Sequence, residues 1–161
     1  MEIISTSHYS RLLDYVKQLA ESDPLVNRVS EGTRVDLDLD KATMFPLLNI
    51  LVDDVDFSNP ATVGFSVELT SLGLVNSSDE IVNNDFYKGS NEIDILNTTS
   101  IILNRITSRI ATERDGTGIT VESVSGTGSI RENGVNTHSG WQITLSVSMP
   151  NNELNLCQYP I

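Results

Sequence analysis

The stretch from Gly140 to Ile161 constrains the fold of this chain more than any other part of the sequence. Its first ten residues alternate between apolar and polar side chains. The apolar positions are Trp141, Ile143, Leu145, Val147 and Met149. A period of two predicts a strand with one face in a core and the other in water or against a partner. Pro150 has no N–H to donate and is expected to end the strand.

The residues that follow are unusually apolar for a chain end. We call residues 150–161 the C-terminal arm. A terminus that stays in water is usually polar, so the arm is expected to lie on a surface, either of its own subunit or of a neighbouring one. Its candidate interface residues are Leu154, Leu156, Cys157, Tyr159, Pro160 and Ile161.

Two helices and several strands are predicted from the rest of the sequence. Apolar side chains recur at helical spacing over Ser7–Glu21 and over Glu92–Thr112. Strand patterns cover Val26–Leu39 with a break at Glu31-Gly32, Phe45–Ser58, Thr62–Val75 and Ile119–Arg131. These elements predict an α+β fold over residues 1–161, a single domain whose antiparallel sheet carries both helices on one face. The expected order is helix, strands, helix, strands.

Residues 77–91 form a long polar connection that is rich in Asn, Ser and Asp. The connection exceeds the usual loop length, and such loops often serve a function. We expect it to project from the domain.

The chain has 22 acidic and 10 basic residues, for a net charge of −12. A protein that binds nucleic acid tightly needs clustered Lys and Arg, so the composition disfavours a nucleic-acid-binding protein. The simplest interpretation of the charge is solubility, although an acidic wall would also let DNA pass without sticking. The one cysteine excludes an intrachain disulfide, and no secretory or membrane-spanning pattern is seen. The protein is therefore expected to be soluble and made in a cytoplasm.

Acidic residues at alternate positions are the nearest approach to a metal site. Asp36, Asp38 and Asp40 would project from one face of a strand and could bind a hard cation. Three adjacent carboxylates repel one another, however, and the apolar residues between them favour the solvated face of an amphipathic strand. Asp53, Asp54 and Asp56 have the same interpretation. A functional alternative is that such carboxylates line an acidic pore.

No other pattern indicates catalysis. His8 and His138 lack the spacing of a zinc site, and the chain has no GxSxG, GxGxxG or P-loop motif. A Ser-His-Asp triad need not be local in sequence, so spacing alone does not exclude one. The glycines around Gly116 and Gly126 are interpreted as turns and a bulge. The chain is therefore predicted not to be an enzyme and to need no metal or cofactor.

The C-terminal pattern resembles a known group of proteins. It combines Ser139-Gly140-Trp141-Gln142-Ile143, an alternating strand, Pro150 and a Leu-x-x-Cys-x-x-Pro ending over residues 154–160. Together with Thr43-Met44-Phe45-Pro46-Leu47 before a buried strand, it resembles small tail-completion proteins of phages of Bacteroidota hosts, including crAss-like phages. The element order is also similar to the tail-terminator fold of long-tailed phages.

This resemblance implies a structural virion protein. Such proteins form sixfold or twelvefold rings at the neck or tail end, contact other ring proteins, and leave a channel through which DNA passes without specific binding. On this view Asp36, Asp38 and Asp40 face the channel, and the arm contacts the next subunit. Two alternatives remain: a monomeric or dimeric ligand-binding α+β domain with its arm folded on itself, and, less well supported, a metal-dependent enzyme that uses the aspartates.

Overall fold

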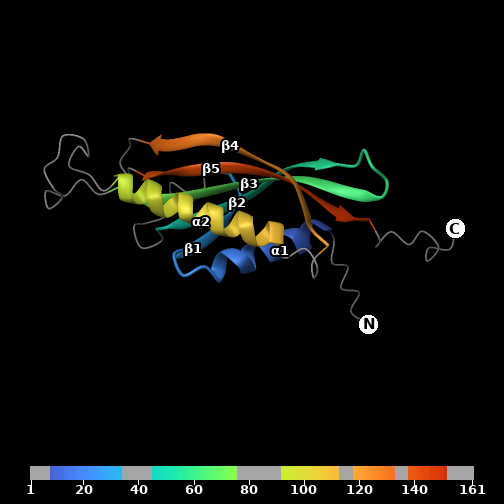
Figure 1. Ribbon diagram of the computed structural model, residues 1–161, viewed down its shortest axis with the longest axis horizontal. Helices are drawn as coiled ribbons and strands as arrows, with labels where there is room; N and C mark the ends of the chain where they lie inside the picture. The colour runs from blue at the N-terminus through green and yellow to red at the C-terminus, as the bar shows by residue number, and fades with distance from the viewer. Residues whose placement is uncertain (1–7, 34–44, 76–91, 113–117, 133–137, 152–161) are drawn as a thin grey trace, which may run out of the picture.

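A five-stranded sheet with two helices makes up the described part of the chain (Figure 1). The structure is a computed structural model that describes residues 8–33, 45–75, 92–112, 118–132 and 138–151. The elements in chain order are α1 (His8–Glu21), β1 (Arg28–Glu31), β2 (Leu47–Asp56), β3 (Thr62–Leu74), α2 (Glu92–Thr112), β4 (Thr120–Glu132) and β5 (His138–Pro150). The strands lie in the order β1-β2-β3-β5-β4.

Both helices follow the apolar periodicity of the sequence. In α1 the buried residues are Leu12, Val16, Leu19 and Ala20. In α2 they are Leu96, Thr99, Ile102, Leu103, Ile106 and Ile110. After α1 the chain turns through Asp23-Pro24, where the Asp23 N–H still donates to the Ala20 carbonyl at 3.1 Å. A residue before proline avoids the helical region, so the helix ends at Glu21, the last residue of the predicted range.

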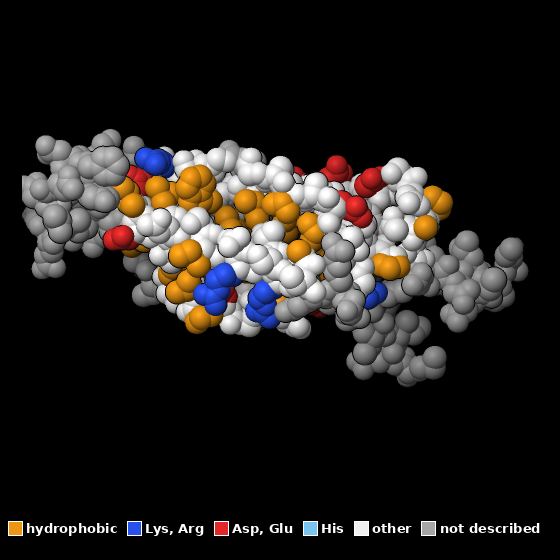
Figure 2. All heavy atoms as spheres, viewed as in Figure 1, with side chains coloured by type: hydrophobic (Ala, Val, Ile, Leu, Met, Phe, Trp, Pro, Cys, Tyr) orange, Lys and Arg blue, Asp and Glu red, His pale blue; other side chains and the backbone are white. Residues whose placement is uncertain are grey.

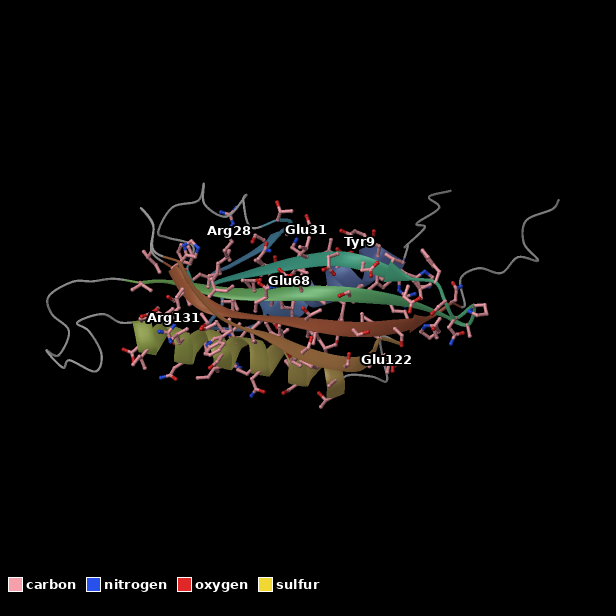
Figure 3. All side chains as sticks on the ribbon, turned by 90° about the horizontal axis from the view of Figure 1, so that it is seen from above. Tyr9, Arg28, Glu31, Glu68, Glu122 and Arg131 are labelled. Atoms are coloured by element: carbon pink, nitrogen blue, oxygen red, sulfur yellow. The ribbon has the colours of Figure 1, made fainter. Side chains whose placement is uncertain are left out.

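The helices pack on one face of the sheet (Figure 3). One hydrophobic core fills the space between the helices and the sheet. Alternate residues of β3, from Val63 to Leu69, and of β5, from Leu145 to Met149, point into this core and are at most 5% exposed. Trp141 packs at its margin and donates from Nε1 to the Leu96 carbonyl at 2.9 Å. The α+β class predicted from the alternation is confirmed.

The sheet is mixed, so the prediction of an antiparallel sheet is wrong in one respect. β1 pairs with β2 in parallel, with Arg28 opposite Leu47 and Glu31 opposite Ile50, whereas the other three pairs are antiparallel. Residues 32–46 separate β1 from β2, which is long enough for the crossover that parallel neighbours need. Apolar alternation reports which face is buried and carries no information on strand direction.

The helix-free face of the sheet has a small apolar cluster of its own. Leu47, Leu72 and Ile130 are buried there, Phe45 packs against them, and the Phe45 ring stacks on His138 at 6.4 Å between centroids. Gly140 lies in the same cross-strand row, between Leu72 of β3 and Ile130 of β4. A Cβ at this position would stand 1.8 Å from the Ser71 carbonyl oxygen, so only glycine fits.

The end of β5 and the interruption of β4 agree with the sequence. β5 ends at Pro150, and the Asn151 N–H donates to the Ala61 carbonyl at 2.9 Å. The ladder between β4 and β5 shifts register between Gly126 and Gly128, which confirms the bulge that the glycines predicted.

No helix within the described ranges is long and apolar enough to cross a membrane.

Candidate functional site

Most of the residues proposed from the sequence lie outside the described ranges. These are the arm residues Leu154, Leu156, Cys157, Tyr159, Pro160 and Ile161, the aspartates Asp36, Asp38 and Asp40, and the connection 77–91. Their proposed roles stay predictions. The second acidic group, Asp53, Asp54 and Asp56, is described and exposed at the end of β2.

The two histidines are far apart and belong to different surroundings. His138 begins β5 and is buried beside Phe45, whereas the His8 ring lies at the opposite end of that strand. The Nε2 atom of His8 is 3.1 Å from the Pro150 carbonyl oxygen. A carbonyl oxygen can only accept a hydrogen bond, so the His8 ring donates there. The described part of the chain therefore does not bring these two side chains to one site.

A polar hollow of about 600 Å³ lies at the end of the helix-free face. Three carboxylates, from Asp54, Asp56 and Glu122, share this hollow with the hydroxyls of Ser66, Ser146 and Ser148. We call it the acidic hollow. The Ser148 hydroxyl donates to Glu122 Oε1 at 2.7 Å. The Ser58 backbone N–H donates to Asp56 Oδ1 at 2.8 Å, and hydrogen bonds from the Ser58 backbone and hydroxyl lower the pKa of Asp56.

The acidic hollow does not have the geometry of a metal centre. No group of three or more His, Cys, Asp or Glu side chains within the described ranges is placed to hold a metal ion. Two of its carboxylates already accept hydrogen bonds from neighbouring serines. What the hollow offers is a negative, hydroxyl-rich surface that repels phosphate.

An apolar groove of about 500 Å³ lies on the other face, between α2 and the strands β4 and β5. Figure 2 shows apolar side chains gathered along this line. We call it the α2–β4 groove; its lining is Ser100, Leu103, Asn104 and Thr107 of α2, Val124, Gly126 and Gly128 of β4, and Trp141, Gln142 and Ile143 of β5. Val124 is 50% exposed there. The volume is within the range of ordinary ligand pockets.

Two glycines of β4, Gly126 and Gly128, line the groove and add no side chain to it. Around Gly126 and Gly128 no heavy atom lies within 4 Å of where a Cβ would stand. The sequence pattern predicts turns and a bulge at these glycines but not the groove. The signal was present: a strand with two glycines beside a helix with a wide apolar stripe leaves apolar surface uncovered.

Comparison with known proteins does not add an identity. Neither a scan against protein-family models nor a search of curated proteins found a match to this chain.

Proposed function

We propose that this protein is a structural component of a phage virion. It assembles into a sixfold or twelvefold ring at the neck or tail end, with a tail-terminator-like fold. The ring joins or caps the tail, contacts other ring proteins, and leaves a channel for DNA. No catalytic step is assigned to it. The proposal starts from the resemblance of the Gly140–Ile161 stretch to tail-completion proteins.

The polar helix-free face is the observation that best supports this role. Below the small apolar cluster, the outward rows of β2, β3, β5 and β4 carry carboxylates and hydroxyls. One cross-strand row contains Asp54, Ser66, Ser146 and Ser123, and Glu68 stands opposite Thr144 in another. A wall of this kind repels the DNA backbone and does not retain it, which suits a channel. The net charge of −12 acts in the same direction.

Assembly of the purified protein is the direct test. Native mass spectrometry and electron microscopy should show a closed ring of identical subunits, because head-to-tail interfaces close when the rotation permits. A protein that remains monomeric across the whole accessible concentration range would contradict the proposal.

The channel-facing role of the helix-free face has a separate test. Duplex DNA should not be retained by the wild-type protein, whereas Asp54→Lys with Asp56→Lys should produce salt-sensitive binding. A matched pair on the covered side of the molecule, Asp14→Lys with Asp94→Lys on the exposed surfaces of the helices, makes the same change in charge elsewhere. Equal DNA binding by both double variants would remove the special role of the helix-free face.

The α2–β4 groove favours a second candidate, a small ligand-binding domain. Its apolar lining and volume would accept a compact hydrophobic molecule. In that case the protein is monomeric or dimeric, and an apolar dye should bind with one-to-one stoichiometry and raise the midpoint of thermal unfolding.

A further inference from the structure

We propose that the α2–β4 groove is the docking site for the C-terminal arm of a second copy of the chain. The partner segment is residues 152–161, Asn-Glu-Leu-Asn-Leu-Cys-Gln-Tyr-Pro-Ile. The inference deepens the proposed ring, because it names the surface and the segment that link one subunit to the next.

The groove and the arm are complementary in chemistry. The groove exposes apolar surface from Val124 and Trp141 that nothing in the described ranges covers. The arm carries Leu154, Leu156 and Ile161, which are costly to leave in water. The arm supplies apolar side chains of the kind that the groove could cover.

Chain length favours a neighbouring subunit over the same one. The arm leaves the described structure at Asn151, whose N–H donates to the carbonyl of Ala61, directly before β3. The centre of the groove, at Trp141 and Ile143, lies eight to ten residues back along β5, about 27–34 Å at the rise of an antiparallel strand. Leu154 and Leu156 can extend at most about 11 and 18 Å from Asn151. Both leucines therefore fall short of the centre of their own groove, whereas a neighbour's arm can enter with all its apolar side chains.

The groove is a better docking surface than the free edge of β4. β4 has one neighbour among the described strands, so its outer edge could in principle add a strand. Register shifts between Val121 and Ser123 and between Gly126 and Gly128 interrupt its ladder. Bulges of this kind disfavour regular strand addition, which leaves side-chain insertion into the groove as the dominant contact.

Trp141 provides a direct measurement, because it is the one tryptophan of the chain and lines the groove. The receiver is the full chain with Leu154→Asp and Leu156→Asp, whose own arm no longer competes. Titration with the synthetic peptide of residues 152–161 should shift the Trp141 emission to shorter wavelength and saturate. The peptide with the same two Asp substitutions should produce no shift.

Substitutions in the groove test its location. Val124→Glu should weaken peptide binding at least tenfold, because a carboxylate would enter an apolar groove. Val124→Thr keeps the branched side-chain shape, so the protein should still fold if Val124→Glu does not. Val124→Thr should weaken peptide binding by a smaller factor than Val124→Glu. Val55→Thr is the matched control, since Val55 is 38% exposed and lies outside the groove. Equal affinity in Val124→Thr, Val124→Glu and the control would overturn the proposal.

A mixing experiment separates docking on a neighbour from docking within one subunit. Val124→Glu retains an intact arm, and Leu154→Asp with Leu156→Asp retains an intact groove. Each variant alone should remain monomeric, and an equimolar mixture should form a heterodimer, because one intact arm meets one intact groove. A mixture that contains monomers only would overturn docking between subunits.

The readouts distinguish failure of this inference from failure of the ring. Peptide binding at the groove without assembly of the wild-type chain would contradict the ring and keep the site. Assembly of the wild-type chain without peptide binding up to about 1 mM would keep the ring and overturn the site. Binding of an apolar dye but not of the peptide would assign the groove to a small ligand and would likewise overturn the site.

Discussion

The two faces of the sheet are built from the same strands but differ in what covers them. On the helix-covered face, β3 and β5 present Val67, Leu69, Leu145 and Val147, all buried under α1 and α2. On the other face, the intervening residues include Ser66, Thr144 and Ser146, which are partly or fully exposed. The first face buries the larger apolar cluster, which favours folding, and the second leaves polar groups available for contact with other molecules.

The helix-free face has a buried apolar cluster at one end and a polar surface over the rest. Gly140 lies in the row of the cluster, and its substitution has the largest expected effect. Gly140→Ala should cost about 4 kcal/mol or prevent folding, since its Cβ would overlap the Ser71 carbonyl of the paired strand. Chemical denaturation measures the loss. Gly126→Ala on the bulged edge strand is the control, because no heavy atom within 4 Å opposes its Cβ. Equal losses for the two variants would mean that β3 and β5 are not as closely paired as described.

Adjacent residues of β5 compare the two faces directly. Leu145→Ala should lower the free energy of unfolding by about 3 kcal/mol through lost burial and a cavity under the helices. Thr144→Ala, one residue earlier and on the helix-free face, should cost less than about 1 kcal/mol. Both values come from urea midpoints at constant slope. Similar losses would show that the helix-free face also contributes a packed core at this row.

On the helix-covered side, a buried ion pair can be compared with an exposed one. Asp23 is 5% exposed; its Oδ1 accepts from the Leu25 N–H at 2.9 Å, and its Oδ2 lies 3.2 Å from Arg105 Nε of α2. Asp23→Asn keeps the first contact and loses the second, so we expect a cost of about 1–2 kcal/mol. Lys17→Ala breaks the exposed pair with Glu21 and should cost below about 0.5 kcal/mol. If the two variants lose the same amount, the buried position gives Asp23 no added importance.

The smallest expected effect concerns pH at the acidic hollow. The pKa of Asp56 is lowered by its hydrogen bonds from Ser58. A lowered folded-state pKa contributes stability above the unfolded value of 3.8, and this contribution is lost as the pH falls through the folded pKa. Thermal unfolding of wild type and Asp56→Asn should differ slightly at pH 7 and converge at strongly acid pH. A difference that widens on acidification would contradict the assignment.

Local patterns predicted most of the elements, and the errors have physical causes. Helix bounds at Glu21, Glu92 and Thr112 agree with the structure, because apolar periodicity and Asp23-Pro24 act over a few residues. The Val26–Leu39 pattern is a strand at Arg28–Glu31, and residues 34–44 lie outside the described ranges. His138 begins β5, where Phe45, distant in sequence, stacks on its ring.

The sequence by itself determined the two amphipathic helices, the alternation of β3 and β5, the end of β5 at Pro150 and the apolar character of the arm. These features depend on residues that are close together in the sequence, so their pattern is visible without knowledge of the tertiary structure. Tertiary structure alone decided that β1 runs parallel to β2, that Asp23 meets Arg105, and that the glycines of β4 line a groove beside α2. Each of these depends on which distant segments pack together, and a period of two or 3.6 does not specify a partner.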